Sequence, residues 1–210
     1  MPDQGSYDPQ PGQKACTLDS YTSKPIPTMA LTESLYTKVK KGDAAPGFTL
    51  PDLEGKQVSL DAFKGKPTLV VFMCNHCPYV VHKIGTIVAL DKEFPDLQVV
   101  GINSNDVINY PHDSPEKMKE FAQEKGIGFP YLFDESQEVS RAWGASCTPD
   151  PFLLDAELKL AYHGRFDDAL EPGTTATTQE MKDAILELLA GKPVTVQEKV
   201  SIGCSIKWKA

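Results

Sequence analysis

The sequence predicts an α/β protein with a central mixed β-sheet, helices on both faces of the sheet, and an N-terminal β-hairpin. Three observations lead to this fold class. Residues 68–74, TLVVFMC, form a continuous apolar run of the kind found in a strand buried on both faces. Strand and helix patterns then alternate as βαβαβα, which predicts parallel pairing of the strands. A last hairpin and a helix complete the sheet and make it mixed.

The elements up to the first helix are the most clearly bounded. Apolar residues alternate on either side of the turn DLEGK, residues 52–56, as in a β-hairpin. The buried strand 68–74 follows. Pro78 suits the first helical position because the N–H that proline lacks is unpaired there, and apolar residues recur at helical spacing through Val88. The segment Cys74-Asn75-His76-Cys77 therefore lies at a strand-to-helix junction.

The second half of the chain continues the alternation of strands and helices. Ser114 and Gly126 are placed to begin and end a helix. A turn at residues 155–157 joins two strands. The other expected elements are a buried strand at 97–105, a short strand at 129–133, a short helix at 137–143, and a helix at about 178–189 ended by Gly191.

We expect three segments along the 210 residues. Residues 1–28 are rich in Pro, Gly, Ser and Gln and lack hydrophobic periodicity, which predicts a disordered leader. This leader has no apolar stretch for secretion, and its three Asp with no Arg argue against an organellar transit peptide. Residues 29–195 are expected to form the domain, and residues 196–210 a C-terminal tail.

Composition limits the partners and the compartment. A net charge of −8 disfavours nucleic acid and anionic membrane surfaces, since both attract clustered Lys and Arg. No run of 18 or more apolar residues is present, so no transmembrane segment is expected. Five cysteines are an odd and low number, unlike a secreted disulfide framework, which favours a reducing cytoplasm. A close cysteine pair in that compartment indicates redox chemistry or a metal site.

The sequence resembles the thioredoxin-like superfamily, in its peroxiredoxin-like or redoxin branch of the alkyl hydroperoxide reductase/thiol-specific antioxidant type. The resemblance covers roughly residues 40–190 and rests on three stretches. These are GDAAPGFTLPDLEGKQVSLDAFKGKPTLVVF, the cysteine-containing turn, and WGASCTPDPFLLD. It implies a thioredoxin-like fold and a cis-proline that precedes the last hairpin and faces the active-site thiol. That pattern selects Pro149, so the Thr148–Pro149 bond is expected to be cis.

The same resemblance leaves two registers for the nucleophile. Counting without gaps from Phe72 places the family's first cysteine on Cys77, and Pro78 at the start of the helix supports this register. The alternative makes Cys74 the nucleophile and needs a shortened loop. At a helix start the unpaired N–H groups and the helix dipole favour a thiolate, and a protonated His76 acts in the same direction. Cys77 is therefore the expected nucleophile.

A thiol–disulfide cycle also needs a resolving thiol and an electron donor. Cys74 and Cys147 are both candidates, and Cys204 is a third if the tail folds back. Thr148 and Pro149 are expected to position an extended substrate opposite the thiol, with His76 and Pro78 beside it. The expected substrates are a protein disulfide or a small thiol or peroxide. Electrons would come from a dithiol protein such as a thioredoxin, with no organic cofactor.

Two other functions stay open. Peroxiredoxins carry Pro, three residues, Thr or Ser, two residues, and then the reactive cysteine. Counting back from Cys77 gives Val70 and Cys74, and counting back from Cys74 gives Pro67 and Val71, so only a lone proline matches and peroxidase activity is in doubt. The second alternative is a non-catalytic binding protein that holds a metal through Cys74 and Cys77.

That metal site would draw on further ligands, with His76 or His82 adding nitrogen and Cys147 a third sulfur. A second CxxC or HxxxH motif is missing, so no metal ligands are assigned. Residues 103–106 end a strand at the same sheet edge as the cysteine turn, but ordinary turn chemistry is the preferred interpretation for them.

Overall fold

The computed structural model describes residues 31–34 and 38–210. The leader expected at residues 1–28 and Cys16 fall outside this part of the chain. The strands are β1 (Leu31–Glu33), β2 (Thr49–Pro51), β3 (Gln57–Ser59), β4 (Thr68–Phe72), β5 (Gln98–Asn103), β6 (Tyr131–Phe133), β7 (Cys147–Thr148), β8 (Asp150–Leu154), β9 (Leu160–His163) and β10 (Ile202–Ser205). The helices are α1 (Pro78–Glu93), α2 (Pro115–Lys125), α3 (Glu138–Trp143) and α4 (Glu180–Leu189), with short 3-10 turns at Leu60–Phe63 and Pro111–Asp113.

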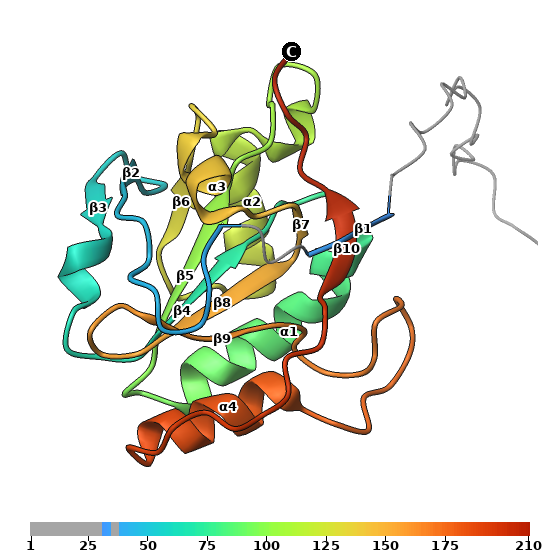
Figure 1. Cartoon of the computed structure of the whole chain (residues 1–210). Helices are drawn as coiled ribbons and strands as arrows, with labels where there is room; N and C mark the ends of the chain where they lie inside the picture. Colours follow the sequence, from blue (N-terminus) through green and yellow to red (C-terminus); the bar gives the residue numbers. More distant parts are fainter. Residues whose placement is uncertain (1–30, 35–37) are drawn as a thin grey trace, which may run out of the picture.

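The predicted mixed sheet has the strand order β6-β5-β4-β8-β9 (Figure 1). Strand β4 pairs in parallel with β5 and antiparallel with β8, so it lies at the centre of the sheet. The predicted hairpins are present as β2–β3 and β8–β9. All five residues of β4 are buried, as the continuous apolar run indicated.

Each face of the sheet carries its own apolar core. Alternate β4 residues contribute to opposite cores because successive side chains of a strand point to opposite faces. Leu69 and Val71 pack against α1, α2 and α4 on one face. Val70 and Phe72 pack on the other face against Trp143 of α3 and the apolar side chains of the hairpin segment. The fold is thus thioredoxin-like, with helices on both faces.

Two helix boundaries differ by a few residues from the sequence prediction. The short helix begins at Glu138 because Gln137 has a positive φ of 64° and caps the helix. The buried Gln137 side chain donates to the carbonyl oxygens of Ser104 and Lys207 at 2.6 and 2.8 Å, so this conformation has support from both sides. The last helix begins at Glu180, because the N–H groups of the two preceding threonines bind the Asp168 carboxylate.

The C-terminal segment folds back across the domain. Strand β10 pairs antiparallel with β1 on one side and with β7 on the other, forming a separate three-stranded sheet (Figure 1). The chain then runs beyond β10, and Ile206 is buried in the core on the α3 face of the central sheet. Among the described residues, no helix is long and apolar enough to cross a membrane.

Candidate thiol site at the end of strand β4

The cysteine motif connects the central strand to the first helix. Strand β4 ends at Phe72, and α1 begins at Pro78, as predicted. Cys77 is the N-cap residue, with φ −70° and ψ 120°, so it stands at the helix start as predicted. The carboxyl ends of the parallel strands β4 and β5 lie at this edge, where open α/β sheets commonly place their ligands.

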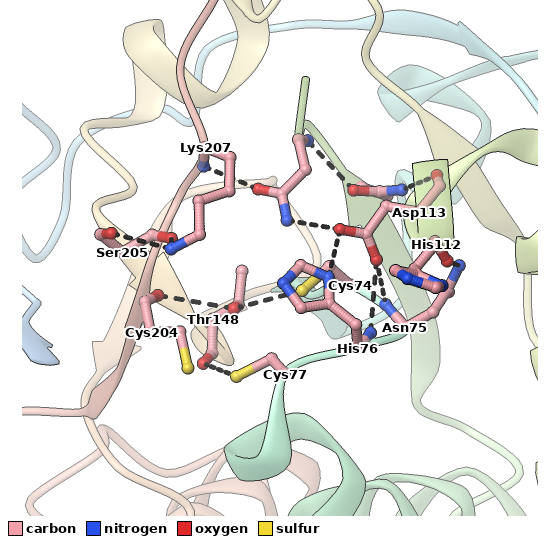
Figure 2. A network of polar contacts seen from close by, with 12 residues as sticks. Cys74, Asn75, His76, Cys77, His112, Asp113, Thr148, Cys204, Ser205 and Lys207 are labelled. Atoms are coloured by element: carbon pink, nitrogen blue, oxygen red, sulfur yellow. Dashed lines mark hydrogen bonds and ion pairs between the residues drawn. The ribbon is translucent and has the colours of Figure 1, made fainter. Parts of the chain in front are cut away.

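Cys77 meets two other thiols at this edge. Its sulfur lies 3.1 Å from the carbonyl oxygen of Thr148 and is fully buried. The thiols of Cys204 and Cys74 both act on the pKa of Cys77. Figure 2 shows the sulfur atoms of Cys77 and Cys204 pointing toward one another, while the Cys74 sulfur lies on the other side of Thr148. The site therefore contains three thiols around one threonine.

The three thiols differ in the direction of their pKa shifts. Burial raises the pKa of Cys77, but the hydrogen bonds from Cys204 and Cys74 outweigh burial, and the pKa is lowered. The backbone N–H of Val80 in the first turn of α1 acts in the same direction. Burial and the hydrogen bond to Cys77 raise the pKa of Cys74. The hydrogen bond to Cys77 and burial likewise raise the pKa of Cys204. Cys77 therefore loses its proton first.

The other predicted substrate-binding residues surround these thiols. The Thr148–Pro149 peptide bond is cis, as the resemblance implied. The Thr148 hydroxyl lies 3.5 Å from both the Cys74 sulfur and the carbonyl oxygen of Cys204. Cys147 is buried, and its thiol points to the Pro149 carbonyl oxygen at 3.7 Å. Burial raises the pKa of Cys147. The structure therefore brings Cys74, Cys77 and Cys204 together around Thr148, whereas the Cys147 thiol is directed to a carbonyl group.

A buried carboxylate holds the turn between the two motif cysteines. Asp113 Oδ1 accepts from the backbone N–H groups of Asn75 at 2.8 Å and His76 at 3.3 Å (Figure 2). Its other oxygen lies 2.6 Å from His76 Nδ1 and accepts from the Asn105 amide at 2.8 Å. Asp113 has no exposed surface. Nothing in the sequence pattern points to Asp113, since a lone aspartate in a loop carries no signal of such a role.

The turn-chemistry interpretation of residues 103–106 was incomplete. Asn103 donates to the backbone carbonyl oxygen of Asp113 at 2.8 Å and Asn105 donates to its carboxylate, so two asparagines of this segment hold Asp113. Asn105 also accepts from the backbone N–H of Lys207 at 2.8 Å, which connects the cysteine turn to the C-terminal segment. The expected local turn contacts are made by Asp106, with the next residues of its own loop, and by Asn103, whose side chain accepts from the N–H of Asn105 at 3.1 Å.

His76 and Pro78 occupy different parts of the site. Pro78 is the first residue of α1. The His76 ring stacks on Tyr110 with centroids 5.9 Å apart and an interplanar angle of 11°. His76 also lines an open depression of about 240 Å³ with Asn75 and His112, on a surface that α2 completes. Cys77 does not line this depression, because the thiol lies on the buried side of the turn.

The chain has two arginines that could help to activate a peroxide, and both are engaged in other contacts. Arg165 binds Glu180 through its Nε at 3.1 Å and its terminal nitrogen at 2.5 Å. Arg141 lies over the Trp208 ring, 4.2 Å from its centroid. Val70 stands at the family's proline position when Cys77 is the reactive cysteine, and Val71 stands at its hydroxyl position when Cys74 is. Both valines are fully buried core residues. Two positions of the peroxiredoxin motif are therefore filled by buried apolar side chains in this chain.

A group of potential metal ligands lies on the Cys74 side of the turn. The Cys74 sulfur, His76 Nδ1 and an Asp113 oxygen lie within 4.8 Å of one another. Cys77, which the metal hypothesis paired with Cys74, is not a member of this group. A metal here would thus have a different ligand set from the one the sequence suggested.

Comparison with known proteins places the chain in a family. Residues 41–163 match the model of the AhpC/TSA family. The chain belongs to the AhpC/TSA family. A protein of Mycobacterium tuberculosis named as a peroxiredoxin is 37% identical over 111 residues, which are 52% of this chain and 66% of that protein, just under two thirds of its length. The peroxiredoxin Bcp of Escherichia coli is 34% identical over 144 residues, covering 62% of this chain and 86% of the relative.

Solved structures agree on the fold. The crystal structure of an uncharacterized conserved protein from Geobacillus kaustophilus superimposes with a TM-score of 0.81 and 42% identity, covering 86% of this chain and 97% of the other. The thioredoxin domain of a thiol-disulfide oxidoreductase from Bacteroides vulgatus gives a TM-score of 0.53 at 23% identity, with 60% and 89% coverage. The second likeness supports the thioredoxin-like fold alone.

Proposed function

We propose that the protein is a thiol–disulfide oxidoreductase of the peroxiredoxin-like kind, with Cys77 as its nucleophile. The observation that carries this proposal is the position of Cys77 at the N-terminus of α1, where the thiols of Cys204 and Cys74 lower its pKa. A thiolate is the attacking species in thiol–disulfide exchange, so the thiol that ionises first is the one that reacts. Membership of the AhpC/TSA family and relatives named as peroxiredoxins support an enzyme acting through thiol chemistry.

Exchange would proceed in two displacements. The Cys77 thiolate attacks one sulfur of a substrate disulfide, forms a mixed disulfide and releases the other substrate sulfur as a thiolate. The Cys74 thiol gives its proton to that leaving group and attacks the Cys77 sulfur, which releases the second substrate sulfur as a thiolate. The substrate disulfide gains two electrons, and the chain ends with a Cys74–Cys77 disulfide. We prefer Cys74 over Cys147 as the resolving thiol because Cys74 and Cys77 both contact Thr148, whereas the Cys147 thiol is directed to the Pro149 carbonyl oxygen.

The residues around Cys77 have matching roles in this proposal. Thr148 and Pro149 would hold an extended substrate backbone opposite the thiol, as the cis bond and the buried Thr148 carbonyl allow. His76 and Pro78 flank the nucleophile, with the His76 backbone fixed by Asp113. A dithiol protein such as a thioredoxin would return the electrons by reducing the disulfide. No organic cofactor takes part in this cycle.

The test is turnover of a protein disulfide. Reduction of insulin by dithiothreitol, followed by turbidity, is expected to be accelerated by the unmodified protein. Cys77→Ser is expected to reduce the rate to that of dithiothreitol alone, while Cys147→Ser, a matched buried-cysteine control, keeps most of the acceleration. Equal rates for the unmodified protein and Cys77→Ser would contradict the proposal.

Peroxide reduction is the second candidate, favoured by the names of the relatives. In that reaction the Cys77 thiolate attacks one peroxide oxygen, forms a sulfenic acid and releases an alcohol or water. The buried valines and the occupied arginines described above argue against efficient peroxide activation. Consumption of hydrogen peroxide with stoichiometric sulfenic acid on Cys77 would favour this candidate, and a rate equal to that of a free thiol would exclude it.

Metal binding is the third candidate, and one observation favours it. Cys74, His76 and Asp113 offer sulfur, nitrogen and oxygen, a set that Zn²⁺ accepts. Binding must displace the Cys74 proton, whose pKa burial raises, so affinity would increase with pH. Titration of the reduced protein with Zn²⁺ is the measurement. Stoichiometric binding that His76→Ala abolishes supports this candidate, and the absence of binding at neutral pH rejects it.

A further inference from the structure

The C-terminal strand covers the nucleophile. Cys77 has no exposed surface, and the groups over it are Thr148 of β7 and Cys204 of β10. A buried thiol cannot attack a substrate from solution, so part of this cover must move before exchange takes place. Thr148 belongs to the chain segment leading into the central sheet, whereas β10 is a four-residue strand near the end of the chain. Strand β10 belongs to a separate sheet, so it can leave Cys77 without breaking the pairing of the central sheet.

Strand β10 occupies the position that an extended substrate would take. It pairs antiparallel with β7, and Cys204 stands opposite Thr148, the residue before the cis-proline. Extended peptides commonly bind by adding a strand to an available sheet edge in this way. Because of this register, the Cys204 thiol reaches Cys77 as the cysteine of a bound peptide would (Figure 2).

Gly203 makes this close approach possible. A Cβ atom at residue 203 would lie 2.1 Å from the Thr148 carbonyl oxygen and 2.7 Å from its carbonyl carbon. Both are backbone atoms, so the clash cannot be relieved by turning a side chain. The Thr148 carbonyl oxygen is also the group that the Cys77 thiol contacts. A glycine directly before the cysteine is therefore required for β10 to dock in this register.

Contacts on both sides of Cys204 hold the strand in place. Ser201 donates from its hydroxyl to the Pro149 carbonyl oxygen at 2.9 Å. The backbone N–H of Ile206 donates to the carbonyl oxygen of Ser146 at 3.1 Å, and Lys207 binds Asn105. These are contacts with the segment around the cis-proline and with the residues that support Asp113. Docking of the tail and the arrangement of the cysteine turn are thus connected.

We propose that β10 is a built-in pseudo-substrate: it fills a binding edge on β7 for an extended Gly-Cys peptide of a partner protein and presents Cys204 for a disulfide with Cys77. The partner peptide and β10 compete for one edge, so the site opens only when β10 leaves β7. This inference rests on the proposed function for its chemistry, but its structural part, the covering of Cys77, stands without it.

The disulfide step balances with the substrate disulfide as oxidant. After Cys77 has formed the mixed disulfide, β10 returns and Cys204 attacks the Cys77 sulfur in competition with Cys74. The Cys77–Cys204 bond forms, the bond to the substrate breaks, and the second substrate sulfur leaves with the proton of Cys204. The product is a closed site in which neither thiol is free. A reducing dithiol must break this bond before the next turnover.

The first test measures how readily Cys77 is alkylated in the reduced full-length chain. Gly203→Ala should weaken docking of β10 and raise the rate of Cys77 labelling by iodoacetamide by about ten-fold or more. Gly85→Ala is the matched control, because a Cβ at Gly85 meets no atom within 4 Å. Equal Cys77 labelling in Gly203→Ala and Gly85→Ala would overturn the proposal.

The unmodified chain gives a second measurement that does not depend on how a variant folds. If one opening of β10 exposes both thiols, Cys77 and Cys204 should become accessible together, and their labelling should respond equally to urea well below the unfolding transition. Labelling of Cys77 while Cys204 stays protected would show that another segment moves, and would contradict the proposal.

Peptide binding tests the partner chemistry. The probe is the synthetic octapeptide VSIGCSIK, which has the sequence of residues 200–207. It should bind Gly203→Ala more tightly than the unmodified protein, because β10 no longer competes. The control peptide VSIACSIK should bind at least about ten-fold more weakly, given the clash at the glycine position. Equal affinity for both peptides, or no binding to either, would overturn the pseudo-substrate assignment.

Oxidation separates this inference from the proposed function. In Cys74→Ser, oxidation with one equivalent of oxidised dithiothreitol, a cyclic disulfide, should produce a Cys77–Cys204 bond. If the unmodified chain forms Cys74–Cys77 while Cys204 stays free in both proteins, the proposed function stands and this inference fails. If Cys77 enters no disulfide in either protein, the proposed function fails, whatever the labelling experiments give.

Discussion

Replacing Asp113 by alanine should strongly destabilise the protein. The carboxylate is fully buried and accepts from three N–H donors, which belong to Asn75, His76 and Asn105. A buried donor that loses its acceptor costs about 1 to 3 kcal/mol. Asn75 and His76 are only partly buried, so water replaces part of what they lose. We therefore expect a loss of about 3 to 5 kcal/mol in the free energy of unfolding.

Urea denaturation followed by tryptophan fluorescence measures this loss, with Asp96→Ala as the control because Asp96 is an exposed aspartate. For a chain of this size the expected decrease in Tm is about 10 °C. The Asn75 and His76 N–H groups also orient the turn that carries Cys77, so the alkylation rate of Cys77 should change in Asp113→Ala. A loss below about 1 kcal/mol, equal to that of the control, would refute the assignment of Asp113 as the anchor of the turn.

Three further predictions concern buried groups outside the thiol site. Burial raises the pKa of Glu180, but hydrogen bonds from its basic neighbours outweigh burial and lower the pKa to about 2. Since this is below the value of 4.5 for a free Glu, Glu180 stabilises the fold above about pH 4.5, and this contribution disappears as the pH falls toward 2. Glu180→Gln should thus cost about 2 kcal/mol at pH 7 and less in acid, measured by urea unfolding at several pH values; an equal cost at all pH values would contradict the ion pairing. Lys83→Met should cost about 3 kcal/mol or more, because the buried Asp167 loses its ion-pair partner, and a variant as stable as the parent in thermal unfolding would be inconsistent with this. Gly101→Ala should cost about 1 to 3 kcal/mol in the same assay, since its Cβ would lie 3.0 Å from Tyr131, and a neutral effect would mean that the ring moves freely.

Local sequence patterns were sufficient to predict the segment that carries Cys77. The apolar run ending at Phe72 and the proline at residue 78 fix the strand end and the helix start, and these two boundaries place Cys77 at the N-cap. The cis bond before Pro149 came from the family resemblance, because spacing alone does not distinguish a cis-proline from other prolines in loops.

Contacts between distant segments could not be predicted in the same way. Asp113 supports the cysteine turn from a loop that follows a different strand, and nothing in its neighbouring residues indicates burial. The tail does contain a signal, since Val200, Ile202, Cys204 and Ile206 alternate with polar or small residues as in a strand. This alternation predicts an element but not its partner, so the pairing of β10 with β7 became visible only in the structure.

The most direct test of the account is disulfide mapping in the unmodified protein. The reduced, metal-free chain is oxidised with one equivalent of a disulfide reagent, the remaining thiols are blocked, and the bonds are identified by peptide mass spectrometry. The account predicts that Cys77 is present in the disulfides that form, with Cys74 or Cys204 as its partner. A chain in which Cys77 remains free, whether or not other cysteines pair, would contradict the assignment of Cys77 as the nucleophile.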